Sequence, residues 1–411
     1  MQFFTRITAL VATTAPFLAY AAPVAAPPAN EVIPGKYIVQ LKPDTDVASI
    51  VAHHNKVRSI HARNLARRGD AGPSGSPVER EYGFGDFKAY SGSFDEATIE
   101  ELKALPEVLT IEQDFIMKIS GLVTQTDAPW GLASISSRTT GATSYVYDDS
   151  AGDGTFSYVM DTGVRITHNE FEGRAIWGFN AVQGSEDTDT EGHGTHVAGT
   201  VGGVTYGVAK KTTIISVKVM GGSTGSASDV FAGLDWTVND IVSKGRENTA
   251  VINMSIGSTG STTWDAAITA AWAKGVLLTV SAGNENDAAI NYSPCRSPEA
   301  ICVGNVEIDN ERHSGGGGSN YGPPVDIFAA GTNIISASYL SDSGTAIHTG
   351  TSMASPHVAG LVSYLRALEG PSTAAEVKAR VYALATPDVV TDTLGSVNLL
   401  AYNGNNMSSR V

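Results

Sequence analysis

Four apolar runs in the second half of the chain lack the alternation of polar and apolar residues that a half-exposed strand shows. They cover residues 157–160, 213–220, 250–255 and 276–281. Helix-like segments separate them, at residues 193–202, 227–243 and 264–274. Strands that are buried on both faces have this pattern, and their alternation with helices predicts an α/β fold with a mostly parallel sheet. Active sites form at the carboxyl ends of such strands.

A smaller pattern precedes this region. The expected elements are a strand at 36–41, a helix at 46–56, a basic and then Gly/Pro/Ser-rich loop at 63–77, a strand at 84–90, a helix at 95–105 and a strand pair at 108–119. This β-α-β-β-α-β order predicts a small ferredoxin-like α+β domain of about a hundred residues.

The first 21 residues have the features of a secretory signal. Arg6 supplies the positive start, residues 7–18 form a short apolar core, and Ala19-Tyr20-Ala21 is a cleavage site of the A-x-A type. The core is too short to span a bilayer, and no other stretch reaches about 18 apolar residues. We therefore expect a secreted, extracellular product with no membrane association.

The net charge limits the possible partners, and the two cysteines allow a disulfide. The chain has 42 acidic and 27 basic residues, a net charge of −15, which argues against nucleic acid or an anionic membrane surface as a partner. Cys295 and Cys302 are the two cysteines, with six residues between them. That spacing allows a small disulfide loop, which an exported protein can form.

The segment Gly350-Thr351-Ser352-Met353-Ala354-Ser355-Pro356-His357-Val358-Ala359-Gly360 leads from small residues into a helix-like run. Pro356 falls in the first turn, where a missing N–H costs little. Ser352 should therefore lie at a helix N-terminus, where free amides and the helix dipole favour a developing negative charge. This suits a nucleophile; the alternative is a plain N-cap serine.

Two further polar residues lie at element boundaries. Asp161 follows a buried strand and precedes a glycine, which suits a carboxylate that orients a histidine, or an Asx-turn residue. His193 is surrounded by glycines and begins a helix of small residues. A zinc site with His196 would need more ligands than the sequence supplies nearby, so His196 and His357 are expected to be structural.

Asn284 ends another buried run, where its amide could donate to an oxyanion, a contribution of about 3 kcal/mol in such sites, or simply form a turn. Together Asp161, His193 and Ser352 follow the chain order of the subtilisin triad. A competing esterase motif, G-x-S-x-G around Ser223, lies between a strand and a helix but leaves the other polar residues without a role.

The motifs resemble those of the subtilisin-like serine proteases, and within them the secreted fungal proteinase K group. The matching segments are Val159-Met160-Asp161-Thr162-Gly163, Gly192-His193-Gly194-Thr195-His196-Val197-Ala198-Gly199, Ser281-Ala282-Gly283-Asn284 and the segment around Ser352. Residues 125–132 resemble the mature start of that group, and 397–403 its end. The resemblance implies a subtilisin-like three-layer fold, a signal at 1–21, an inhibitory propeptide at 22–122 and a peptidase domain at 123–411.

The resemblance also implies the roles of the site residues. Asp161 would hold His193, which would take the proton of Ser352, and Asn284 would stabilise the oxyanion. Peptide substrate would bind along Met220, Gly225, Ser255, Ile256, Gly257, Ala282 and Gly283. Small and apolar walls imply a broad endopeptidase that favours apolar or aromatic residues before the cut, with the propeptide as inhibitor and a cleavage near Leu122.

Calcium is the cofactor that the family usually binds, as a structural ion. The matching positions here are the carbonyls of Pro298 and Ala300 and the carboxylate of Asp326; Asp388 would belong to a weaker second site. Gly315-Gly316-Gly317-Gly318 replaces a more bulky segment of the family. The expected glycosylation sites are Asn291 and Asn406, whereas the sequon at Asn253 falls in a buried strand. A monomer is expected.

Overall fold

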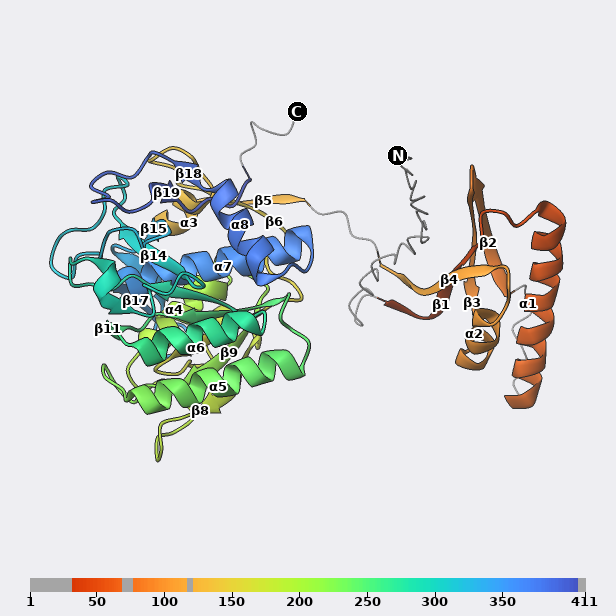
Figure 1. Ribbon diagram of the computed structural model, residues 1–411, viewed down its shortest axis with the longest axis horizontal. Coiled ribbons are helices and arrows are strands. Elements are labelled where there is room, and N and C mark those ends of the chain that lie inside the picture. The colour runs from red at the N-terminus through yellow and green to blue at the C-terminus, as the bar shows by residue number, and fades with distance from the viewer. Residues whose placement is uncertain (1–31, 69–76, 117–120, 406–411) are drawn as a thin grey trace, which may run out of the picture. The chain divides into compact units, whose positions relative to one another are not determined.

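The computed structural model describes residues 32–68, 77–116 and 121–405 of the chain (Figure 1). They fall into two compact units, one that ends at Lys118 and one that begins at Ile119. The signal at 1–21 lies outside the described residues.

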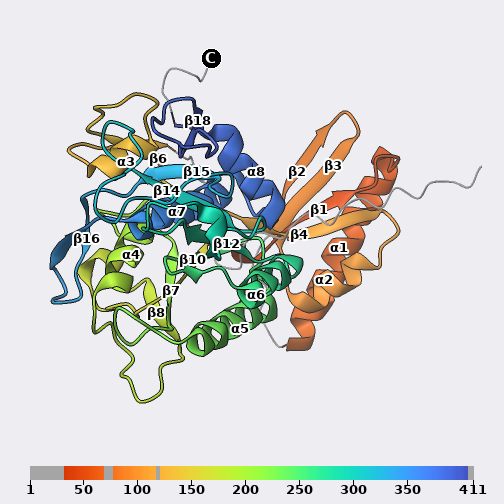
Figure 2. The same cartoon turned by 60° about the vertical axis from the view of Figure 1, so that its left-hand side comes forward.

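The N-terminal unit has the predicted β-α-β-β-α-β order. Its elements are β1 (Val32–Leu41), α1 (Val47–Arg68), β2 (Val78–Phe84), β3 (Phe87–Ser93), α2 (Glu96–Lys103) and β4 (Val108–Phe115). The strands form an antiparallel sheet in the order β2-β3-β1-β4. Both helices pack side by side on one face of this sheet (Figure 2), over a core that includes Val39, Ile60, Tyr90 and Leu102.

Three expectations for this unit were wrong. Helix α1 continues to Arg68, through part of the predicted basic loop, because the side chains of Arg63 and Asn64 bond Glu101 of α2. The strand expected at 84–90 is interrupted, since Gly85 with a φ of 51° turns the chain between β2 and β3. The described part of 108–119 holds one strand, β4, in place of a pair.

The C-terminal unit contains a nine-stranded sheet in the order β18-β19-β15-β14-β12-β10-β7-β9-β8. Its pairs are parallel except for β18 with β19. The four predicted buried runs are its central strands. The strand bounds are β7 (Phe156–Asp161), β8 (Ala175–Asn180), β9 (Thr213–Lys218), β10 (Ala250–Met254), β12 (Leu277–Ser281), β14 (Ile301–Val306), β15 (Ile327–Ala330), β18 (Thr386–Pro387) and β19 (Leu399–Leu400).

Helices cover both faces of this sheet, which makes three layers. The predicted helices are confirmed as α4 (His193–Gly202), α5 (Ala227–Ser243) and α6 (Thr262–Ala273). Helices α5 and α6 run next to each other in both views (Figures 1 and 2), and the rings of Phe231 and Trp264 meet between them at 6.3 Å. The remaining helices are α3 (Trp130–Ile135), α7 (Thr351–Glu369) and α8 (Ala374–Leu384).

Successive residues of a strand point to opposite faces of the sheet, so their side chains belong to two separate hydrophobic cores. On β7, Val159 joins the core that α4 and α7 cover, whereas Tyr158 and Met160 join the core that α5 and α6 cover. Short paired strands complete the unit, at β5 (Leu122–Gln125) with β6 (Tyr145–Asp148), β11 (Ser258–Thr259) with β13 (Tyr292–Ser293), and β16 (Ile334–Ala337) with β17 (Thr345–His348). Among the described helices, none is long and apolar enough to cross a membrane.

Helix α7 is buried without interruption from Met353 to Arg366. Its small residues allow close packing on α4, and Gly360 marks the tightest point. A Cβ atom added there would lie 2.7 Å from the Cβ of Val208 and 2.9 Å from the carbonyl oxygen of Val201. Neither atom belongs to the flexible end of a side chain, so neither can move aside easily.

We therefore expect Gly360→Ala to lower the free energy of unfolding by about 1–3 kcal/mol, as overpacked cores do. In an open helix the same change would stabilise, by up to about 1 kcal/mol. Urea unfolding followed by tryptophan fluorescence measures the difference. Gly316→Ala is the control, because nothing lies within 4 Å of a Cβ atom there. Equal stability of the two variants would contradict the close packing.

Candidate active site

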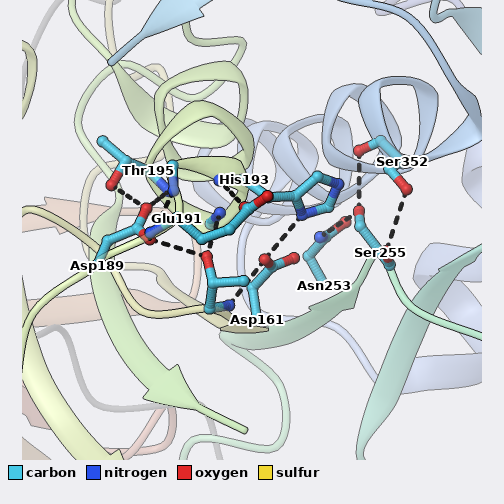
Figure 3. Close-up of polar contacts among 11 residues, drawn as sticks. Asp161, Asp189, Glu191, His193, Thr195, Asn253, Ser255 and Ser352 are labelled. Carbon is cyan, nitrogen blue, oxygen red and sulfur yellow. Dashed lines mark hydrogen bonds and ion pairs between the residues drawn. The ribbon is translucent and has the colours of Figure 1, made fainter. Parts of the chain in front are cut away.

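Asp161 and His193 meet at the carboxyl end of the sheet. Asp161 is the last residue of β7 and is completely buried, and His193 is the first residue of α4. The Nδ1 atom of His193 lies 2.7 Å from the Oδ1 atom of Asp161, and the imidazole side chain keeps 27% of its surface exposed. Figure 3 shows the carboxylate pointing at the ring. The two elements approach closely because Gly194 has no side chain; a Cβ atom there would lie 2.1 Å from the Gly163 carbonyl oxygen.

The charges around His193 favour its protonated form. Burial opposes that form, but the Asp161 carboxylate and its hydrogen bond outweigh burial, and the pKa of His193 is raised from the ordinary 6.5. Glu191 and Asp189 add to the rise in this pKa. Glu191 also accepts a hydrogen bond from the His193 backbone N–H at 2.9 Å. The ring is therefore well suited to accept a proton.

Asp189 holds the start of α4 in place, a role that the sequence did not reveal. Its side chain is 4% exposed. The carboxylate accepts hydrogen bonds from the backbone N–H groups of Glu191, Gly192 and Thr195, at 2.8–3.0 Å, and from the Thr195 hydroxyl. It also accepts a hydrogen bond from the hydroxyl of Thr162, the residue after Asp161. An acidic residue just before a helix is a capping signal that could have drawn attention to it.

Ser352 is the second residue of α7, and Gly350 is the N-cap. The serine is thus inside the first turn and is not the cap residue. Its hydroxyl donates to the Ser255 carbonyl oxygen at 3.1 Å, and the Ser255 hydroxyl donates to the Ser352 carbonyl oxygen at 2.9 Å. Figure 3 shows this reciprocal pair beside the His193 ring. Fully buried Asn253 extends the network, since its amide donates to the Ser255 hydroxyl at 3.0 Å.

Asn284 is oriented by the residue next to Ser352. Its Oδ1 atom accepts from the backbone N–H of Thr351 at 2.8 Å and from the Thr351 hydroxyl at 2.9 Å. Because the oxygen is engaged, the NH₂ group must point the other way. Buried Asn320 holds the same turn: its Oδ1 atom accepts from the backbone N–H of Glu285, and its Nδ2 atom donates to the Ala282 carbonyl oxygen. The sequence did not single out Asn320.

His193, Asn284 and Ser352 line one cleft of about 290 Å³. Of the predicted substrate-binding residues, six line it, namely Met220, Ser255, Ile256, Gly257, Ala282 and Gly283. Gly225 is not among the lining residues. Tyr292, Ser293 and Cys295 also form part of the wall, although the sequence did not indicate them. The cleft thus combines small and apolar residues with the polar side chains of His193, Ser352 and Asn284.

The predicted disulfide is present between Cys295 and Cys302, with a Cα–Cα distance of 4.9 Å. It closes a loop that also carries Arg296, whose guanidinium donates twice to Asp265 of α6, at 2.6 and 2.8 Å. Since Cys295 lines the cleft and Cys302 belongs to β14, the disulfide ties the cleft wall to the central sheet.

The residues predicted to bind calcium lie around a lysine. The Nζ atom of Lys378, on α8, donates to the carbonyl oxygens of Pro298 at 2.6 Å and Ala300 at 2.7 Å. Asp326 accepts a hydrogen bond from the Cys302 backbone N–H at 2.9 Å, and burial raises the pKa of its carboxyl. With an ammonium between the two carbonyls, this donor set does not fit a divalent cation.

The other predicted sites differ in their surroundings. Asn291 is exposed, Asn253 is completely buried as predicted, and Asn406 lies outside the described residues. Asp388 is exposed and has a φ of 61°. Ser223 lines the rim of the cleft. Within the described residues, no group of three or more histidine, cysteine or acidic side chains could hold a metal ion.

His196 and His357 are structural, as expected. The Nε2 atom of His196 bonds the Ile334 carbonyl oxygen at 2.9 Å, and the Nδ1 atom of His357 bonds the Met353 carbonyl oxygen at 2.9 Å. Burial lowers the pKa of His196 to about 3 and that of His357 to about 4, so both rings are neutral at ordinary pH.

Comparisons with known proteins agree with this geometry. Residues 152–404 match the model of the Subtilase family, and residues 36–120 match that of Peptidase inhibitor I9. Alkaline protease 1 of Aspergillus clavatus is 49% identical over 408 residues, 98% of this chain and 100% of that protein. Alkaline proteinase of Hapsidospora chrysogena is 49% identical over 388 residues, 92% of this chain and 93% of that protein.

A solved structure gives the same result for the fold. The crystal structure of a cold-adapted subtilisin-like serine proteinase matches with a TM-score of 0.63 and 38% identity, over 68% of this chain and 99% of that one. The expected subtilisin-like fold is thus confirmed. The chain belongs to the subtilase family and is a serine endopeptidase, synthesised as a zymogen with an I9 inhibitor domain.

Proposed function

We propose that Ser352 is the nucleophile of this endopeptidase, His193 its general base, Asp161 the group that orients and stabilises His193, and Asn284 an oxyanion donor. The observation that carries the proposal is the 2.7 Å contact between the Nδ1 atom of His193 and Asp161, at the rim of the cleft that Ser352 also lines. All steps use groups of this chain.

In the proposed reaction the Ser352 hydroxyl turns from the Ser255 carbonyl oxygen to the Nε2 atom of His193. The serine oxygen bonds to the substrate carbonyl carbon while His193 takes the proton, and the Asp161 carboxylate stabilises the imidazolium. The developing oxyanion receives hydrogen bonds from the Asn284 NH₂ group and the Ser352 backbone N–H. His193 then protonates the amine as the C–N bond breaks. Water repeats the sequence and releases the acyl group.

The cleft supports a broad specificity for the residue before the cut. Its walls are backbone and small or apolar side chains at Ile256, Gly257, Ala282 and Gly283, which suit apolar and aromatic side chains. Met220 lies two residues after the end of β9 and Ser255 directly after the end of β10, and both line the cleft, which supports binding of the peptide as an added strand, with Gly225 flanking it.

Processing follows from the same specificity. We place the propeptide at 22–122 and the peptidase domain at 123–411, with self-cleavage after Leu122. Leu122 is apolar, 37% exposed and lies at the start of β5. Secretion, a monomeric state and glycans on Asn291 and Asn406 complete the proposal. Calcium bound by Pro298, Ala300 and Asp326 does not belong to it, because Lys378 already bonds two of these three residues.

A fluorophosphonate that labels activated serines should add one adduct to the mature protein, on Ser352. The mature mass should correspond to a chain that begins at Val123. His193→Ala should abolish labelling and lower kcat by about 10⁶-fold, as the loss of a triad base does. Intact mass and peptide mapping give the result. Ser223→Ala is the control and should label normally; loss of labelling in that variant would favour the esterase alternative.

The acid limb of the pH profile should report His193. Only the neutral ring accepts the serine proton, so kcat/KM should fall as pH drops through its raised pKa, with a midpoint above about 6.5. Glu191→Gln removes one charge that raises this pKa and should move the midpoint to lower pH, only slightly because Glu191 is exposed. The distant Glu369→Gln should not move it. A midpoint that rises in Glu191→Gln would contradict the assignment.

A panel of peptides that differ at the residue before the cut should show Phe, Leu and Tyr ahead of Arg and Lys by more than about tenfold in kcat/KM, the scale that apolar pockets provide. Replacing the small Gly257 by Val should select against the aromatic residues first, since a side chain there would enter the cleft. Strict preference for Arg or Lys would rule the proposed specificity out.

A further inference from the structure

Lys378 joins two parts of the chain that are distant in sequence. It lies on α8, and its ammonium donates to Pro298 and Ala300 in the loop between β13 and β14, about 80 residues earlier. Two charged hydrogen bonds at 2.6 and 2.7 Å hold that loop against the helix. These distances lie at and just above the upper limit of calcium–oxygen ligand distances, about 2.3–2.6 Å. The lysine nitrogen thus stands where an ion bound to these carbonyls would stand.

The surroundings of the ammonium supply negative charge from several sides. Burial lowers the pKa of the Lys378 ammonium, and the carboxylates of Asp326 and Glu299 offset part of this effect by favouring the charged form. The Oε2 atom of Glu299 is buried and has no hydrogen-bond partner among the described residues. The rings of Trp272 and Tyr382 lie 5.8 and 5.9 Å from Nζ, within the range of cation–π attraction. The carbonyl oxygens, carboxylates and aromatic rings together form a cation site, and the Lys378 ammonium occupies it.

We propose that the Lys378 ammonium replaces the structural calcium ion that subtilases generally bind at this position. A divalent ion cannot share the site, because it would stand within a few ångströms of the ammonium and would have to take over the carbonyl oxygens that the ammonium engages. The ammonium is part of a side chain of α8, so the hydrogen bonds that hold the loop against this helix do not depend on the calcium concentration.

The loop that Lys378 holds also forms part of the cleft. The disulfide between Cys295 and Cys302 closes the loop, and Cys295 lines the cleft. Cys302 also donates its backbone N–H to Asp326, the third predicted calcium ligand. Loss of the Lys378 side chain therefore removes the hydrogen bonds to Pro298 and Ala300, in the same loop whose Cys295 forms part of the cleft wall.

Terbium tests whether a metal ion binds here, since it occupies oxygen-ligand calcium sites and emits when a nearby tryptophan is excited. In protein inactivated by a sulfonyl fluoride, the wild type should show no emission that depends on Trp272, judged against Trp272→Phe. Lys378→Ala vacates the site and should gain such emission, which Trp272→Phe in the same variant should remove. Signal from ions bound elsewhere is unaffected by Trp272→Phe and is subtracted in this way.

Thermal unfolding gives a second readout. Lys378→Ala should lower the Tm by about 5 °C, because the Asp326 and Glu299 charges are left without a partner, and added calcium should restore part of the loss. Lys274→Ala, a change at an exposed lysine, is the control and should keep the wild-type Tm. The proposal fails if wild-type protein shows Trp272-dependent terbium emission, or if Lys378→Ala unfolds at the same temperature as Lys274→Ala. If Lys378→Ala does not fold, the wild-type terbium measurement decides alone.

Discussion

The burial of α7 is the constraint on which the rest of this structure depends. A helix that is enclosed from Met353 to Arg366 needs small residues along its length and neighbours that fit closely, which the sheet and α4 provide. Its first turn emerges at the carboxyl end of the sheet, where β7 ends at Asp161 and α4 begins at His193. The position of Ser352, the proposed nucleophile, is therefore set by core packing and not by a surface loop, which leaves its backbone little freedom to move.

Local sequence patterns account for most of the framework. Apolar runs without alternation predicted the central strands, and the predicted bounds of α4 and α5 matched. Helix α5 has a clear start signal, the N-cap Ser226 that accepts from the Asp229 backbone N–H, whereas α4 begins and ends at glycines. Glycines beside His193 correctly indicated a close approach of backbones. In the N-terminal unit the basic residues near Arg63 were misleading, because charge alone does not end a helix whose side chains find partners on α2.

The contacts that sequence patterns missed join residues far apart in the chain. Asn320 bonds the turn at Ala282–Glu285, and Lys378 bonds carbonyls about 80 residues away. Neither contact follows a helical or strand period, so no local pattern carries it. The resemblance supplied a ligand set for calcium but could not supply the lysine inside it, since that side chain comes from another helix. The ligand set that family likeness suggested for calcium therefore does not fit the side chains that surround it here.

The orientation of Asn284 has one more consequence. Its amide oxygen is held by both donors of Thr351, so the amide dipole is fixed during folding and need not reorient when negative charge develops in the cleft. Because Thr351 precedes Ser352 in the same helical turn, the amide and the serine hydroxyl share a rigid frame. We therefore expect a displacement of the helix to move the Asn284 amide together with the Ser352 hydroxyl, the groups proposed as oxyanion donor and nucleophile.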